Sequence, residues 1–177
     1  MITLSQPALA LHSCDVPGFL YQMSTTWQMP AGATGADVVN WISAAVQQSP
    51  ELALKNVVIN CHGGPGALSV GGVNSPVLND ASVFQGVRTL DIGTIWFTGC
   101  LVATGMLGQN FCSLVAVISG ADVIAANDDQ FVEGSLLGGR PTIFGAIDDF
   151  EGTAYQFSPS GSISLYSIHD PLAEGYS

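Results

Sequence analysis

The chain has 177 residues, of which 47% are hydrophobic and only 10% are charged. Its 14 acidic residues far outnumber its 3 lysines and arginines, so the net charge is −11 at pH 7. This balance excludes the basic footprint of a nucleic-acid-binding protein and disfavours polyphosphate ligands, whereas a cationic partner or substrate is favoured. The length fits a single domain that spans residues 1–177.

No apolar run approaches the roughly 18 uninterrupted residues of a membrane-spanning helix, so no membrane association is expected. Residues 101–119 come closest, but polar residues interrupt them, which favours a buried helix. Because no basic region precedes the first apolar residues, we expect no secretory signal and a cytoplasmic location. The four cysteines form no Cys-x-x-Cys pair, and we expect free thiols.

The first third of the chain predicts two short strands and one helix. The strands are expected over residues 2–4 and 19–23, with a turn at Pro17–Gly18 between them. Apolar residues at helical spacing predict a helix over residues 34–49, which Pro50 ends.

Two hydrophobic blocks then end in reactive side chains. The first, residues 56–61, is followed by His62-Gly63-Gly64-Pro65-Gly66, and the second, residues 92–98, by Gly99-Cys100. Short β-branched and aromatic blocks of this kind are typical of buried parallel strands. If the two strands are neighbours, His62 and Cys100 meet at the carboxyl edge of the sheet, where open α/β sheets bind ligands.

The remaining elements complete an alternation of strands and helices. A glycine-rich loop is expected over 63–75, with a small hairpin near 67–70. Helices are expected over 77–90 and 103–119, and a strand over 122–126. A further strand over 142–147 and a hairpin of strands 153–157 and 162–167 are expected to follow. The alternation predicts an α/β fold with a mostly parallel sheet, in which strand 122–126 lies beside the strand that leads to Cys100.

The pair His62 and Cys100 has the chemistry of a cysteine nucleophile and its base. A thiol needs a nearby imidazole to become a thiolate, and backbone N–H groups must face the developing oxyanion. Gly63 allows close approach of a substrate carbonyl, and Gly99 permits a sharp turn before the cysteine. From spacing alone, the alternative is a core histidine and a core cysteine at two strand ends.

A block ending in His-Gly followed by a block ending in Gly-Cys resembles the caspase-like cysteine peptidases of clan CD. The residues that carry the resemblance are His62-Gly63-Gly64-Pro65-Gly66-Ala67-Leu68-Ser69-Val70-Gly71 and Trp96-Phe97-Thr98-Gly99-Cys100-Leu101-Val102-Ala103, continued by residues 108–111 and 120–126. They are most similar to a bacterial caspase-like domain of unknown function. The resemblance covers roughly residues 34–130.

This resemblance implies a caspase-like three-layer sandwich with a C-terminal β-hairpin, acting on a protein or peptide substrate without cofactor or metal. Cys100 would be the nucleophile and His62 the base or acid, with the N–H groups of Gly63 and Cys100 as the oxyanion hole. The region after strand 122–126 would help to line the pocket for the residue that precedes the cut.

That region carries Asp128 and Asp129, with Glu133 close behind, so we expect a preference for lysine or arginine before the scissile bond. Arg140 in the same region argues for the opposite preference. The alternative interpretation is that Asp128 and Asp129 are solvated loop residues.

Other functions remain open at this point. A catalytically inactive caspase-like module that binds a partner is the main alternative, and the sequence leaves the oligomeric state undetermined. The glycine loop also resembles that of α/β-hydrolases, but no Gly-x-Ser-x-Gly pentapeptide is present. We expect no site at the other cysteines, histidines and acidic residues considered. Cys61 and Cys112 are expected in the core, His12 and His169 in solvent, and Asp148, Asp149 and Glu151 in a surface turn.

Overall fold

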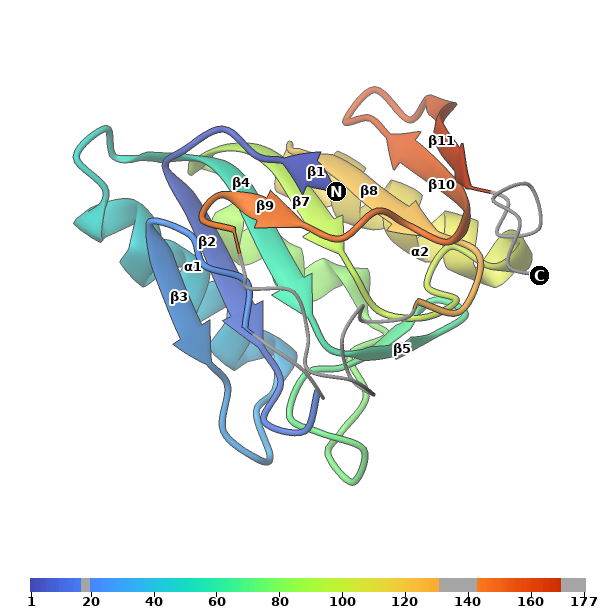
Figure 1. The fold of residues 1–177 in the computed structure, drawn as a ribbon, viewed down its shortest axis with the longest axis horizontal. Helices are drawn as coiled ribbons and strands as arrows, with labels where there is room; N and C mark the ends of the chain where they lie inside the picture. Colours follow the sequence, from blue (N-terminus) through green and yellow to red (C-terminus); the bar gives the residue numbers. More distant parts are fainter. Residues whose placement is uncertain (17–19, 131–142, 170–177) are drawn as a thin grey trace.

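A mainly parallel seven-stranded sheet forms the centre of the protein. The computed structural model describes residues 1–16, 20–130 and 143–169. The parallel strands are β2 (Ala8–His12), β3 (Thr25–Gln28), β4 (Ala53–Asn60), β7 (Asp91–Phe97) and β8 (Asp122–Ala126). The antiparallel strands β10 (Gly152–Phe157) and β11 (Ile163–His169) extend it, in the order β11-β10-β8-β7-β4-β2-β3 (Figure 1). The predicted α/β class with a mostly parallel sheet is confirmed.

Three helical segments pack on one face of this sheet, which lies in front of them in Figure 1. They are α1 (Gly35–Gln48), the 3-10 helix η1 (Ala81–Val87) and α2 (Gly105–Ser119). The first begins where the hydroxyl of Thr34 and the carboxylate of Asp37 cap each other's backbone N–H groups. The last ends at Gly120, as predicted, in a left-handed conformation that glycine adopts without strain.

The opposite face is covered by irregular segments and a two-stranded sheet of β1 (Ile2–Thr3) and β9 (Ala146–Ile147), visible in front of the large sheet in Figure 1. Its core includes Trp96 from β7, stacked on Phe150. A separate hairpin of β5 (His62–Gly64) and β6 (Ala67–Ser69) follows β4, close to the predicted small hairpin.

The strand order places a crossover point between β2 and β4. From β2 the chain moves to β3 at one edge, returns through α1 to β4 on the other side of β2, and then continues outward to β7 and β8. Loops after neighbouring strands diverge at such a point, which leaves room for a ligand at the carboxyl ends. The segments after β2, β4 and β7 all emerge at this edge.

The N-terminal predictions were right in part: the expected strand over 2–4 is β1 and the expected helix over 34–49 is α1, while the turn expected at Pro17–Gly18 lies outside the described residues. Strands β2 and β3 were not predicted, and described residues 20–23 of the expected strand 19–23 form no strand. The alternation of alanine and leucine in Ala8–His12 has weak β-propensity, and burial between two neighbours overrides it. In place of the helix expected over 77–90, the structure has the shorter η1. Of the strand expected over 142–147, only residues 146–147 form a strand, and residue 142 lies outside the described part.

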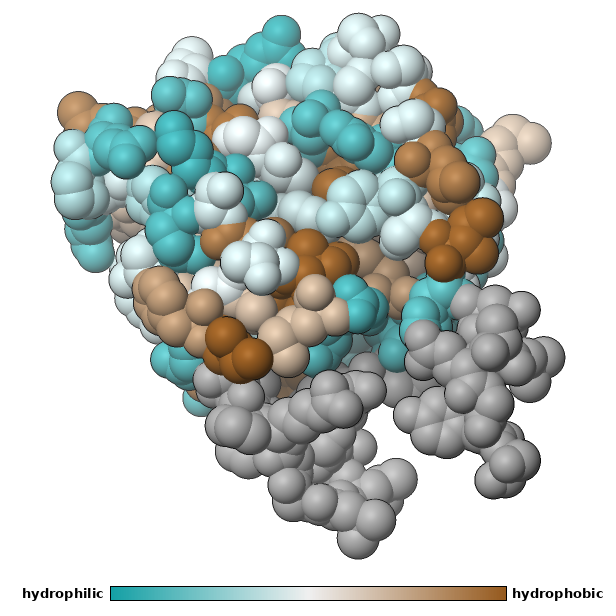
Figure 2. Space-filling view, turned by 45° about the horizontal axis from the view of Figure 1, so that its top comes forward, coloured by the Kyte–Doolittle hydropathy of each residue, from teal (hydrophilic) through white to brown (hydrophobic). Residues whose placement is uncertain are grey.

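Residues 101–119 do not form a fully buried helix. The helix α2 carries no charged residue, yet Met106, Leu107 and Leu114 are exposed on its outer side. Within the described ranges, no helix is long and apolar enough to cross a membrane. The face seen in Figure 2 shows hydrophobic side chains in separate groups among hydrophilic ones.

Candidate active site

His62 begins β5, directly beyond the carboxyl end of β4. As predicted, β4 and β7 are adjacent parallel strands, so the segments that carry His62 and Cys100 leave the same edge of the sheet. The side chain of His62 is 41% exposed, and its Nε2 lies 3.7 Å from Oδ1 of Asp15. The imidazole of His62 is thus open to a substrate and has a carboxylate beside its ring.

Cys100 lies in a sharp turn that follows β7. Its half-buried Sγ accepts a hydrogen bond from the backbone N–H of Gln130 at 3.3 Å and lies 3.6 Å from the carbonyl oxygen of the same residue. The backbone of Gln130, which follows β8, therefore fixes the position of the Cys100 sulfur. Leu101 has a φ of 60°, which is uncommon for a branched residue and is stabilised by a 2.9 Å hydrogen bond from its N–H to Asp128.

The two segments touch through glycines. A Cβ atom on Gly63 would lie 2.6 Å from the carbonyl oxygen of Cys100, and one on Gly99 would lie 2.7 Å from that of Cys61 and 3.2 Å from the nitrogen of Gly63. Any larger residue would push the segments apart. The backbones of Gly63 and Cys100, the expected oxyanion-hole residues, therefore lie next to each other.

Asp15 belongs to this site and was missed in the sequence. It follows β2, and its carboxylate accepts hydrogen bonds from the Ser13 hydroxyl at 2.7 Å and the Val73 N–H at 2.8 Å. The Ser13 hydroxyl foremost, and then the Val73 N–H and His62, hold the pKa of Asp15 below its ordinary value. Recognising Ala8–His12 as a strand would have identified Asp15, because loops after parallel strands share one edge.

The other cysteines lie outside the site. Cys61 is 3% exposed, on the helical face of the sheet, and burial raises its pKa to about 12. Cys112 in α2 is also buried, and burial raises the pKa of its thiol as well. Both positions agree with the predicted core. All four cysteines are free thiols, and among described residues no three His, Cys, Asp or Glu side chains are grouped as metal ligands would be.

His12 is not solvated as expected. It is the last residue of β2 and has no exposed surface. Its Nε2 lies 3.3 Å from the carbonyl oxygen of Tyr21, and burial lowers its pKa to about 4. The carbonyl can only accept, so Nε2 carries the proton and the ring is neutral at pH 7.

Asp128 and Asp129 are both exposed in the loop after β8, which lies beside β7 as predicted. The only carboxylate hydrogen bond of Asp128 within the described residues is to the N–H of Asp129. The residues Glu133 and Arg140, which were weighed with them, lie outside the described residues.

A small pocket of about 20 Å³ lies between these loops and is lined by Tyr21, Thr98, Gln130, Asp148, Asp149, Phe150 and Glu151. The acidic turn expected to be plain surface therefore faces the strand end that leads to Cys100. The pocket has room for about one water molecule, so it is closed to an amino-acid side chain in this conformation.

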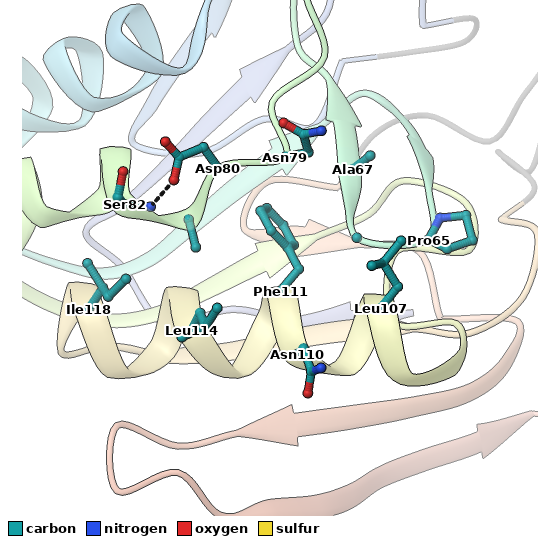
Figure 3. Close-up of a pocket in the computed structure, with 12 residues that line it drawn as sticks. Pro65, Ala67, Asn79, Asp80, Ser82, Leu107, Asn110, Phe111, Leu114 and Ile118 are labelled. Atoms are coloured by element: carbon teal, nitrogen blue, oxygen red, sulfur yellow. Dashed lines mark hydrogen bonds between the residues drawn. The ribbon is translucent and has the colours of Figure 1, made fainter.

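A larger pocket of about 430 Å³ lies between α2, η1 and the β5–β6 hairpin, with Phe111 projecting into it (Figure 3). It is lined by Pro65, Gly66, Ala67, Asn79, Asp80, Ala81, Ser82, Leu107, Asn110, Phe111, Leu114 and Ile118. None of these is a nucleophile paired with a base, and Asp80 caps η1 through the Ser82 N–H. The edge with Asp15, His62 and Cys100 is therefore the stronger candidate for chemistry.

No curated protein and no solved structure matches this chain. A family model does match, over residues 15–137, which is more than half of the chain and includes Asp15, His62 and Cys100. The chain therefore belongs to the family described as domain of unknown function DUF4347.

Proposed function

We propose that the protein is a caspase-like cysteine endopeptidase in which Cys100 is the nucleophile and His62 the base and acid. The observation that carries this proposal is the contact between the His62–Gly63 and Gly99–Cys100 segments at the carboxyl edge of the sheet. A cysteine with an N–H at its sulfur and a histidine with a carboxylate at its ring are the parts that such a reaction needs. The mainly parallel sheet, with helices on one face, supports the α/β part of the proposed caspase-like fold.

In the proposed reaction, His62 takes the thiol proton, and the sulfur of Cys100 attacks the carbonyl carbon of the scissile peptide bond. The oxyanion that forms is stabilised by the N–H groups of Gly63 and Cys100. The C–N bond then breaks, His62 protonates the departing amine, and a thioester remains. Water attacks this thioester after giving a proton to His62, which releases the acid product and restores the thiol.

Asp15 would act on His62 rather than on the substrate. Its carboxylate is held by Ser13 and Val73, so it offers a fixed negative charge to the imidazolium that forms during the reaction. Asp15 is therefore proposed as the residue that orients and stabilises His62.

The test is cleavage of a fluorogenic peptide library by the purified chain, combined with iodoacetamide labelling of its four thiols at neutral pH. We expect cleavage, and faster labelling of Cys100 than of Cys14, Cys61 and Cys112. Exposed Cys14 is the informative control, since exposure alone would label both at similar rates.

The second candidate is a catalytically silent caspase-like module that binds a partner. One observation favours it: within the described residues no hydrogen bond joins Cys100 to His62. Cys100 is instead bonded to Gln130, which follows β8, and His62 lies beside Asp15, which follows β2 on the other side of the site. Dyads of unliganded peptidases are often loose, so this geometry fits both functions. Absence of cleavage, together with labelling of Cys100 no faster than Cys14, would favour the silent module.

For the substrate, we propose a preference for lysine or arginine before the cut. The support is the exposed carboxylates of Asp128 and Asp129 in the loop bonded to Leu101, together with the net charge of −11. The same library tests this, and the double variant Asp128→Asn, Asp129→Asn should weaken the preference. Enrichment of acidic residues before the cut would contradict it.

A further inference from the structure

The carboxyl ends of three neighbouring strands are joined by a row of polar side chains, of which His12 and Asn60 are buried and Thr98 is half-buried. His12, Asn60 and Thr98 lie side by side across β2, β4 and the end of β7. The Thr98 hydroxyl donates to Oδ1 of Asn60 at 3.0 Å, and Nδ2 of Asn60 lies 3.0 Å from Nδ1 of His12. Asn60 is therefore the central member of the row, with a partner on each side.

The hydrogen-bond roles within this row are fixed by its outer end. Because Nε2 of His12 donates to the carbonyl of Tyr21, Nδ1 of the neutral ring has a free electron pair and accepts from the amide of Asn60. The Asn60 oxygen then faces Thr98 and accepts its hydroxyl proton. Each polar atom along the row has one matching partner, so the arrangement resists displacement of any one strand end.

Each member of the row lies just before one residue of the candidate site. Asp15 follows His12 by three residues, His62 follows Asn60 by two, and Cys100 follows Thr98 by two. The backbone supports the same alignment, since the N–H of Ser13 donates to Asn60 and that of Thr98 to Ile59. A shift of the row would therefore be passed to all three site residues through very short pieces of chain.

We propose that Asn60 is a positioning residue that holds the segments of His62 and Cys100 next to each other by bridging Thr98 and His12. The inference rests on the proposed peptidase function of this pair. Asn60 touches neither the substrate nor the reacting atoms, and it acts through the placement of the two segments. A misplacement of about 1 Å at such a site can lower the rate of reaction about a hundredfold.

The same strand offers a matched control. Asn56 is 7% exposed against 4% for Asn60, and it lies on the same face of β4, four residues earlier. Its Oδ1 accepts from Nε1 of Trp96 on β7 at 2.7 Å, and its Nδ2 donates to Ser5 at 2.8 Å. Asn56 thus also bridges β7 and an N-terminal segment, but away from the carboxyl edge.

The experiment compares Asn60→Leu, Thr98→Val, Thr98→Ser and Asn56→Leu with the unaltered chain, by peptide cleavage and by the pH dependence of Cys100 alkylation. For Asn60→Leu and Thr98→Val we expect kcat to fall about tenfold to a hundredfold with KM little changed, and the alkylation midpoint to move to higher pH. Thr98→Ser keeps the hydroxyl and should retain both values. Asn56→Leu should lower the unfolding midpoint in urea while keeping kcat and the alkylation profile. Thr98→Val, which keeps the side-chain shape, carries the test if Asn60→Leu does not fold.

Two results would overturn the inference: unchanged kcat and alkylation profile in Thr98→Val and Asn60→Leu, or an equal loss in Asn56→Leu. Failure of the proposed function is distinguishable, because the alkylation profile of the unaltered chain would then be the same as that of His62→Ala, and both proposals would fall. If that profile depends on His62 but not on Asn60 or Thr98, only the positioning role is refuted.

Discussion

Two layers at the carboxyl edge of the sheet each hold one histidine and one cysteine. In the inner layer, His12 and Cys61 are buried, and burial lowers the pKa of the first to about 4 and raises that of the second to about 12, so both are neutral at pH 7. In the outer layer, His62 lies beside Asp15, and the sulfur of Cys100 accepts an N–H. Burial thus separates the inner histidine and cysteine from an outer pair of the same two residue types, which is more exposed and has polar partners.

The largest difference should be seen between the two cysteines. Cys100→Ala should lower peptide cleavage by more than about a thousandfold, because no other thiol lies at the site. Cys61→Ala should keep kcat and lose about 1–2 kcal/mol of unfolding free energy through a core cavity. Initial rates and urea unfolding measure the two effects. Full activity of Cys100→Ala would show that Cys100 is not the nucleophile.

Replacing the outer histidine should be nearly as severe. His62→Ala should fall within about tenfold of Cys100→Ala, and the double variant should be no worse than the more severe single one, because nucleophile and base act as a unit. The measurement is kcat of the three variants at one pH. Additive losses would show that His62 and Cys100 act independently.

The inner histidine should control stability instead. Its pKa is about 4 in the folded state against 6.5 in the unfolded chain, so between these values the unfolded chain binds more protons. The unfolding free energy should therefore decrease as the pH falls through this window, by about 3 kcal/mol in total. Urea unfolding from pH 7 to pH 4 measures this. His12→Asn should lose most of this pH dependence of the unfolding free energy, and His62→Ala should keep it. The opposite result would show that His62, and not His12, controls the pH dependence of stability.

Asp15→Asn should have the smallest effect on the outer layer. It keeps the shape of the side chain but removes the charge beside His62, so we expect kcat to fall about tenfold with KM unchanged. Because the folded-state pKa of Asp15 is lowered, its contribution to stability is present above about pH 4 and lost as the pH falls further, and the variant should lack this loss. An unchanged kcat would show that Asp15 stabilises its loop and does not contribute to catalysis.

The sequence predicted best the parts whose hydrophobic pattern is continuous. The elements α1, β4, β7 and β8 lie within a few residues of their predicted bounds, because each is a periodic or uninterrupted apolar run between clear breaks. Their order predicted that the segments of His62 and Cys100 leave the same edge of the sheet, and the parallel pairing of β4 with β7 confirms this.

The parts that were missed depend on contacts between distant residues. Ala8–His12 becomes a strand because β3 and β4 pair with its two sides, and local propensity does not reveal this. Without that strand, Asp15 was a loop residue and His12 a solvated one. The role of Asn60 was equally hidden, because its two partners come from residues far away in the sequence.

The contacts of His62 with Asp15 and of Cys100 with Gln130 have a consequence for biosynthesis. The four residues follow β2, β4, β7 and β8, which are spread over more than half of the chain, and both of these contacts join residues far apart in the sequence. Long-range pairings of this kind form late in folding, because loop closure must precede them. A growing chain would thus carry an ordinary thiol at position 100 until β8 has been synthesised and docked. The order of synthesis itself would delay the onset of reactivity, with no need for a separate inhibitor during that time.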